Sequence, residues 1–448
     1  MNPAAGTLFG PDLSADEAFA RALDEADPLA EFRNRFELPV GDDGAPAVYL
    51  AGNSLGPLPR AARRAVETEL TRWSRRGVDG WFDDDGWYGI DERFLPPLAA
   101  LVGAACSEVA VLNGLTVNLH LLLASFFRPA GERRGILVDA PCFPSDRFAV
   151  ETQLRWHGLD PAVALLEVGA ERGDGADEEA IERVLAERGG EIALALVGGV
   201  NFLTGRRLDL ARLARAARAA GAVLGVDLAH AVGNVPLRLH EWDVDFAAWC
   251  HYKYANAGPG APAGIFVHER HAGRRETPRL GGWWGNDPRT RFRMQLDPRF
   301  HPRADAAGWQ LSCPPALAMA PLGPALALFE EAGLEALRAK SVRLTAYLEW
   351  LLRRRPAGSV ELLTPADPER RGAQLSLRVR GDARALQARL LRAGVVGDFR
   401  APDVLRLAPA PLFNGFHDAW RAAEAIAALA DDAGRPSAAA AAEEGSRA

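Results

Sequence analysis

Residues 222–260, AVLGVDLAHAVGNVPLRLHEWDVDFAAWCHYKYANAGPG, decide how the fold of this chain is interpreted. Asp227 interrupts an apolar run that is typical of a buried strand, and Lys253 follows a second such run at 246–252. Runs that are apolar throughout indicate strands covered on both faces, as in a mainly parallel sheet with crossover helices. The stretch therefore predicts an α/β fold with one charged residue in each of two successive strand regions.

Lysine is almost absent from the sequence. Lysine and arginine together number 52, yet the only lysines are Lys253 and Lys340. Lys340 lies in an amphipathic helical pattern beside Arg343, so we expect it to be a solvated surface charge. Lys253 has apolar and aromatic neighbours, which makes a surface position the less favoured alternative. A primary amine forms an imine with an aldehyde and a guanidinium does not, so Lys253 is predicted to hold a carbonyl cofactor.

Asp227 predicts the nature of that cofactor. A buried carboxylate is costly unless a cation pairs with it, and a protonated pyridine nitrogen is such a cation. A salt bridge to a structural arginine is the alternative, but the nearby Lys253 favours pyridoxal 5'-phosphate (PLP). His230 either lies against the cofactor ring or is a satisfied core histidine, and taken alone the core position is favoured.

A phosphate group is expected at the amino terminus of a helix. The sequence offers a strand at 108–113, the turn Asn113-Gly114-Leu115, and Thr116 at the start of an apolar helix. An ordinary N-cap is the alternative for Thr116. Phe143 precedes another helix start, where it either stacks on an aromatic cofactor or belongs to the core.

Composition and motifs argue against several other classes of protein. A formal net charge of −7 and a pI near 5.8 argue against a nucleic-acid-binding protein. Four separated cysteines and nine scattered histidines contain no CxxC or HExxH motif, so no disulfide and no metal site is predicted. The glycine-rich segment 258–264 precedes a strand, which is the wrong place for a dinucleotide-binding loop. Without a signal-peptide pattern or an apolar run of about 18 residues, we expect a cytoplasmic protein with no membrane partner.

The chain is expected to contain a large and a small domain. Residues 1–47 form an acidic helical segment predicted to pack on the small domain, 48–320 a large PLP-binding domain, 321–432 a small C-terminal domain, and 433–448 a disordered tail. A helix at 206–220 is predicted to end at Gly221. The candidate strands are AVYLAG (47–52), EVAVLN (108–113), GILVDA (135–140), IALALVGG (192–199), AVLGVDLA (222–229) and FAAWCHY (246–252).

Residues 227–260 resemble the cofactor-binding core of kynureninase, a fold-type I PLP enzyme. The similarity continues in order over roughly 48–420. It includes YLAGNSLGPLP (49–59), NGLTVNLHLLLASFF (113–127), CFPSDRFA (142–149), VNFLTG (200–205), LGGWWG (280–285), GWQLSCPP (308–315) and LRLAPAPLFNGFHD (405–418). Cysteine desulfurases and class V aminotransferases share the fold and the DxxH-plus-lysine arrangement but not these strings, and remain the alternative. The resemblance implies a large domain with a mainly parallel seven-stranded sheet, a small α+β domain, and a homodimer.

The resemblance also implies a role for individual residues. Lys253 would hold PLP and move the substrate α proton, Asp227 would pair with the pyridine nitrogen, and Tyr252 would relay a proton. Cofactor contacts would further include Leu115, Thr116, Phe143, Ser145, Asp146, His230, Trp283 and Cys313. Substrate contacts would be Arg406, which is expected to bind the α-carboxylate, together with Ser54, Trp81 and Trp284.

The implied reaction is hydrolysis of the Cβ–Cγ bond of L-kynurenine to anthranilate and L-alanine, in tryptophan degradation. This chain departs from the family pattern near the substrate ring. Trp81 replaces a frequent histidine, Cys313 a frequent asparagine, and Trp284 a phenylalanine found in some members. These positions make the pocket more apolar, so an unsubstituted or ring-modified kynurenine is the expected substrate.

Overall fold

The computed structural model describes residues 3–41, 44–169, 175–274, 276–354 and 360–430, which form two compact units. The first unit combines Met1–Pro57, Leu203–Arg206 and Glu335–Ala448, and the second combines Leu58–Phe202 and Arg207–Leu334. The sequence predicts domain boundaries after residues 47 and 320, whereas the units divide after Pro57 and Leu334. The tail predicted at 433–448 lies outside the described residues.

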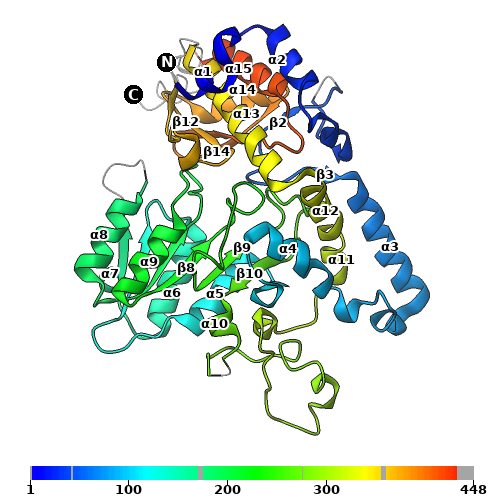
Figure 1. The fold of residues 1–448 in the computed structure, drawn as a ribbon, viewed down its shortest axis with the longest axis vertical. Coiled ribbons are helices and arrows are strands. Elements are labelled where there is room, and N and C mark those ends of the chain that lie inside the picture. The colour runs from blue at the N-terminus through cyan, green and yellow to red at the C-terminus, as the bar shows by residue number, and fades with distance from the viewer. Residues whose placement is uncertain (1–2, 42–43, 170–174, 275, 355–359, 431–448) are drawn as a thin grey trace, which may run out of the picture. The chain divides into compact units, whose positions relative to one another are not determined.

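The second unit contains a seven-stranded sheet with helices around it (Figure 1). Its strand order is β4-β10-β9-β8-β7-β5-β6. Strand β10 runs antiparallel to β4 and β9, and the other neighbouring pairs are parallel. This confirms the predicted α/β fold with a mainly parallel seven-stranded sheet. The strands are β4 Val109–Leu112, β5 Gly135–Asp139, β6 Leu165–Val168, β7 Ile192–Gly198, β8 Val223–Asp227, β9 Phe246–Trp249 and β10 Ala263–Val267.

The helices of the second unit follow local signals in the sequence. The side chain of Asp209 accepts a hydrogen bond from the backbone N–H of Arg212 and so begins α9, which ends at Gly221 in the left-handed conformation (φ 72°). The predicted end of this helix is confirmed. Its start lies at Leu210 and not at the predicted residue 206, because Asp209 is the N-cap. The helices are α3 Arg60–Arg76, α4 Leu95–Val102, α5 Leu115–Phe126, α6 Pro144–Trp156, α7 Pro161–Ala164, α8 Glu178–Arg188, α9 Leu210–Ala220, α10 Glu269–Ala272, α11 Ala316–Met319 and α12 Leu322–Ala332.

Two strand assignments need correction. The predicted strand 47–52 reduces to β2 Val48–Tyr49, which pairs with β13 Val395–Val396 in the first unit and does not join the large sheet. Strand β6 was not predicted, because at the sheet edge its side chains alternate between buried and more exposed positions, unlike the continuous apolar runs of the central strands. Uninterrupted apolar runs therefore do not identify the edge strand β6, and they predict too long a strand where β2 lies.

The first unit packs helices against a four-stranded antiparallel sheet of order β11-β12-β15-β14. Apolar side chains of α13, α15 and this sheet form its core, and Phe9 near the N-terminus packs edge-on against Phe416. The elements are α1 Pro3–Phe9, α2 Glu17–Glu25, β2, α13 Leu334–Arg354, β11 Val360–Leu362, β12 Leu375–Val379, α14 Ala383–Arg392, β13, β14 Asp398–Arg400, β15 Val404–Leu407 and α15 Phe416–Ala430.

Within the part of the chain that the structure describes, no single helix has the length and apolar character needed to cross a membrane. By length and composition alone, one bent pair meets that criterion, Ala316–Ala332 with Leu334–Arg354.

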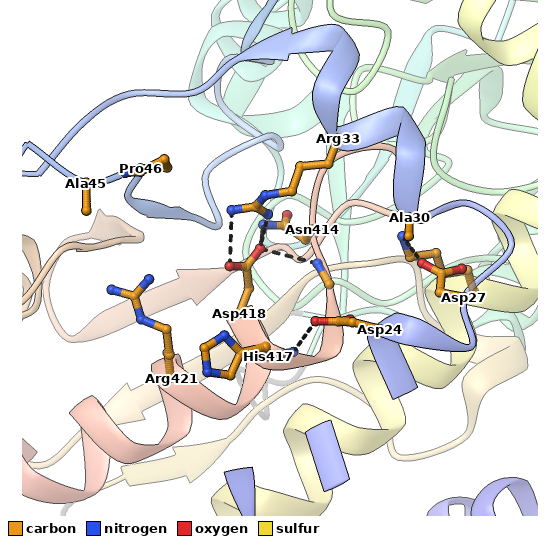
Figure 2. Close-up of a pocket in the computed structure, with 12 residues that line it drawn as sticks. Asp24, Asp27, Ala30, Arg33, Ala45, Pro46, Asn414, His417, Asp418 and Arg421 are labelled. Carbon is orange, nitrogen blue, oxygen red and sulfur yellow. Dashed lines mark hydrogen bonds and ion pairs between the residues drawn. The ribbon is translucent and has the colours of Figure 1, made fainter. Parts of the chain in front are cut away.

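Lys340 is not the surface residue that the sequence predicts. Its side chain is only 7 % exposed, and its Nζ lies 2.6 Å from Oδ2 of Asp27. Both residues line a pocket in the first unit (Figure 2), next to the ion pair of Arg33 with Asp418. The helical pattern around Lys340 is amphipathic, but the segment that contains Asp27 folds onto its polar side. Lys340 is therefore part of a buried ion pair that ties the N-terminal segment to α13.

We predict that Lys340→Met lowers the free energy of unfolding by about 3–5 kcal/mol, because it leaves the buried carboxylate of Asp27 without its cation. Adding Asp27→Asn should recover most of the loss. Arg378→Ala, which removes an exposed pair in the same unit, should change the value by about 0.5 kcal/mol or less. Denaturant unfolding measures all three variants, and wild-type stability for Lys340→Met would contradict the assignment.

Candidate active site

The carboxyl ends of the parallel strands bring the predicted residues together. Strands β5, β7 and β8 are parallel neighbours that end at Asp139, Gly198 and Asp227, and Lys253 follows β9 in the next turn. Ligands of open α/β sheets bind at this edge. A cavity lies there, lined by Leu115, Asp139, Pro141, Cys142, Phe143, Asp146, Leu196, Val197, Gly198, Val200, Asn201, Phe202, Asp227, His230 and Lys253.

Three carboxylates share this cavity. Burial raises the pKa of Asp146 well above its ordinary value, and the adjacent Asp227 carboxylate raises it further, while Lys253 opposes the shift. Burial also raises the pKa of Asp139 to about 6, although that carboxylate accepts a hydrogen bond of 2.9 Å from the backbone N–H of Gly198. Lys253 is the only lysine or arginine among the described residues that line the cavity. The site as it stands therefore has an excess of negative charge.

Lys253 is held in a defined position. Its side chain is buried, and its Nζ lies 5.8 Å from the centre of the Phe143 ring and 6.0 Å from that of Tyr252. The turn that carries it is anchored by His251, whose Nε2 accepts a 2.8 Å hydrogen bond from Nε1 of Trp249. Burial lowers the pKa of His251 to about 4, so its ring is neutral and its Nδ1–H donates to the carbonyl of Pro262.

Tyr252 and Cys250 lie beside Lys253 in the same turn. Burial raises the pKa of the Tyr252 hydroxyl, and the hydrogen bond with Cys250 raises it further. Burial also raises the pKa of the Cys250 thiol to about 11. Both groups are therefore protonated near neutral pH.

Thr116 and Ser145 meet at the starts of two helices. The hydroxyl of Thr116, the second residue of α5, lies 2.8 Å from that of Ser145, the second residue of α6. The alternative that Thr116 is an ordinary N-cap is wrong, because Gly114 occupies the cap position of α5. Two helix amino termini and two hydroxyls in contact form a region suited to an anion.

The predicted tryptophans lie in an aromatic cluster of the second unit and do not line the cavity around Lys253. The ring of Trp284 packs 6.0 Å from that of Trp81 and 5.0 Å from that of Trp283. The guanidinium of Arg291 lies 4.2 Å from the centre of the Trp284 ring. Cys313 is exposed and also does not line the cavity.

Arg406 and Ser54 lie together in the first unit. The fully buried guanidinium of Arg406 donates a 3.1 Å hydrogen bond to the hydroxyl of Ser54. It also forms two hydrogen bonds with Asp398, of 2.6 and 2.5 Å.

Several residues of these sites were not found from the sequence. Asp139 ends an apolar run just as Asp227 does, so the same signal applied to ILVDA could have identified it. Asn201, Cys142 and Asp398 carry no local signal, because their position depends on contacts with distant segments.

One group of possible metal ligands, Glu108, His240 and His268, lies elsewhere in the second unit. The buried carboxylate of Glu108 already accepts hydrogen bonds from the backbone of Ala105 and Glu269 and from Nδ1 of His240. Both oxygens of the Glu108 carboxylate therefore already accept hydrogen bonds within the protein.

Comparison with known proteins identifies the family and the fold. The model of the kynureninase C-terminal domain matches residues 337–426. The kynureninase of Xanthomonas euvesicatoria pv. vesicatoria is 52% identical over 419 residues, which cover 92% of this chain and 98% of the relative. Among solved structures, a mutant of C-DES with glycine covalently linked to its PLP cofactor has a TM-score of 0.72 and 18% identity, covering 88% of this chain and 98% of that one. The cysteine desulfurase CsdA from Escherichia coli has a TM-score of 0.70 and 18% identity, covering 90% and 98%. At this identity the structural matches establish the fold alone.

We predict that Asp146→Asn stabilises the protein prepared without PLP. The raised pKa of Asp146 means that its ionised form costs stability, and this cost is fully present at high pH and absent at low pH. The expected gain at pH 8 is on the order of 0.5–2 kcal/mol, the usual size of a single stabilising substitution. The gain should be smaller at pH 5.

The measurement is denaturant unfolding at both pH values, with the exposed Asp84→Asn as a control of equal charge change. An Asp146→Asn protein that is less stable than wild type at pH 8 would show that the carboxylates do not repel one another.

Proposed function

The chain belongs to the kynureninase family, and from this premise we infer that it hydrolyses the Cβ–Cγ bond of L-kynurenine to give anthranilate and L-alanine. The single observation that supports this most is the high identity with a kynureninase over nearly the whole of both chains. The reaction lies in tryptophan degradation, and its substrate is a small amino acid.

The residues around Lys253 fit pyridoxal 5'-phosphate, the cofactor of this family. Oδ1 of Asp146 is buried and has no hydrogen-bond partner among the described residues. The excess of carboxylates is suited to a cationic pyridinium ring, and we propose that Asp227 pairs with its nitrogen while Asp146 supports that pair. Phe143 and His230 line the same cavity and would contact the ring. Thr116, Ser145 and the amino terminus of α5 at Leu115 would hold the phosphate.

When bound, PLP supplies an electron sink for charge that develops at the substrate's α carbon. Lys253 is proposed to hold the cofactor covalently and, once its ε-amine is released beside a cationic ring, to remove the α proton. Tyr252 keeps its hydroxyl proton near neutral pH and is proposed to deliver it during carbon–carbon cleavage.

Substrate recognition is assigned to two further groups of residues. We propose that Arg406 binds the substrate α-carboxylate, a bidentate role suited to a guanidinium, with Ser54 next to it. Trp81 and Trp284 are proposed to contact the substrate ring. Their rings pack 6.0 Å apart at an interplanar angle of 55°, an apolar contact with few hydrogen-bonding groups.

We propose that the protein is a cytoplasmic homodimer. Trp283 and Cys313 do not line the cavity around Lys253 of their own chain, yet both are proposed cofactor contacts. In a dimer, Trp283 and Cys313 of one chain could contact the cofactor bound by the other chain, because Cys313 is exposed and Trp283 is half-buried. Sedimentation equilibrium tests the dimer, and a monomer with full activity would contradict it.

The alternative of a cysteine desulfurase or an aminotransferase is not favoured, because the likeness to solved desulfurases extends only to the fold. The deciding experiment incubates the PLP-loaded protein with kynurenine, cysteine and a panel of amino acids paired with a keto acid. Anthranilate from kynurenine supports the proposal, whereas sulfide or a new keto acid without anthranilate would favour the alternative.

We predict that Lys253→Ala abolishes anthranilate formation and the visible absorbance of bound cofactor, while circular dichroism and thermal unfolding stay close to wild type. Lys340 is the only other lysine, and its amine is committed to Asp27. Lys340→Arg, which keeps the charge of that pair, is the matched control and should retain both signals. A borohydride-reducible adduct that persists in Lys253→Ala would refute the assignment.

We predict that kcat/KM for kynurenine exceeds that for 3-hydroxykynurenine by roughly ten- to a hundredfold. An indole offers one donor and a thiol is a weak hydrogen-bonding group, so Trp81 and Cys313 would poorly compensate a desolvated ring hydroxyl, at a cost of about 1–3 kcal/mol. Trp81→His/Cys313→Asn should narrow the ratio. A wild-type preference for 3-hydroxykynurenine that the double substitution leaves unchanged would overturn this account of the ring pocket.

A further inference from the structure

Asp398 and Arg406 are direct cross-strand partners. Asp398 opens β14, Arg406 lies in the antiparallel strand β15, and the two residues stand opposite each other in the register. Side chains that face each other across such a pair lie on the same side of the sheet. The backbone pairing therefore determines that this carboxylate and this guanidinium meet.

The contact between them is bidentate. Nε of Arg406 donates to Oδ1 of Asp398 at 2.6 Å, and Nη2 donates to Oδ2 at 2.5 Å. Nη2 also donates to the hydroxyl of Ser54 at 3.1 Å, and that hydroxyl in turn donates to Oδ2 of Asp398. Two parallel bonds to a planar guanidinium fix both its position and the plane in which it lies. A single monodentate contact would leave the plane free to rotate.

Burial makes this partner necessary. The Arg406 side chain is fully buried, and a buried guanidinium is costly without a carboxylate. Burial would raise the pKa of Asp398, yet its bonds to Arg406 and Ser54 and the charge of Arg400 hold the pKa below its ordinary value. Asp398 is therefore ionised at neutral pH.

A second arginine shares the same carboxylate. Arg400 lies two residues after Asp398 on β14, so it faces the same side of the sheet, and its Nη2 lies 3.0 Å from Oδ2 of Asp398. Of these three charged side chains, two are guanidiniums and one is a carboxylate, which favours the binding of a further carboxylate such as that of an amino acid.

We propose that Asp398 is the positioning residue of Arg406: it orients the guanidinium so that Arg406 receives the substrate α-carboxylate. The inference rests on the proposed role of Arg406 in substrate binding. Asp398 acts through Arg406 and does not touch the reacting atoms, so its loss weakens substrate binding more than it slows the chemical steps.

The test compares Asp398→Asn with wild-type PLP-loaded enzyme in steady-state kynurenine cleavage. The expected result is a KM increase of roughly tenfold or more with kcat changed about threefold or less, the pattern of an interaction made equally in the bound and transition states. Asp398→Glu keeps the charge on a longer side chain and should raise KM by an intermediate factor. Asp403→Asn removes a partly exposed carboxylate of the same unit, one that pairs with Arg378, and should leave both constants unchanged.

Three additional readouts separate the possible outcomes. The Asp398→Glu protein should have the cofactor absorbance and the thermal unfolding of wild type. If Asp398→Asn does not fold, the KM of Asp398→Glu tests the positioning role instead. Arg406→Ala is measured in parallel. If it leaves KM unchanged, the proposed role of Arg406 fails. If Arg406→Ala raises KM while both Asp398 variants keep or lower the wild-type KM, the positioning role of Asp398 is overturned.

Discussion

The repulsion among three neighbouring carboxylates, two of them buried, is the constraint on which the site depends. Asp139, Asp146 and Asp227 converge because parallel strands and the helix after β5 all deliver residues to one edge of the sheet. Lys253 offsets only part of their charge. A protein that keeps such an arrangement loses stability unless a cation completes it. The arrangement is therefore explained by a ligand that carries positive charge on a ring and negative charge on a phosphate. The two helix starts near Thr116 and Ser145 are suited to the phosphate.

Charge balance also distinguishes the two groups of residues that are proposed to recognise the substrate. Around Arg406, one carboxylate serves two guanidiniums, so the excess charge is positive and suits a substrate carboxylate. Around Trp284, the guanidinium of Arg291 lies against aromatic faces and donates to a backbone carbonyl, so it supports the rings and is not placed to bind an anion. The charged and apolar ends of the proposed substrate thus correspond to two chemically distinct sets of side chains.

The fold class and the centre of the candidate site could be predicted from the sequence because two signals were strong. The near absence of lysine marked Lys253, and a carboxylate inside an apolar strand marked Asp227. Other features depend on contacts between distant segments. Lys340 has the local pattern of a surface residue, and only the fold shows that Asp27 covers it. Residues 47–52 have the pattern of a central strand, but only Val48 and Tyr49 form one, and it pairs with Val395–Val396. Asp398 resembles any polar residue at the start of a strand until its partner across the sheet is known.

The central claim is that Lys253, facing these carboxylates, holds the cofactor. Its most direct test is borohydride reduction of the PLP-loaded protein, followed by proteolysis and mass spectrometry of the lysine-containing peptides. The chain has only two lysines, so the result is unambiguous. The account predicts the pyridoxyl mass on the peptide that contains Lys253 and none on the peptide that contains Lys340. Labelling of Lys340, or no labelled lysine in a protein that forms anthranilate from kynurenine, would contradict it.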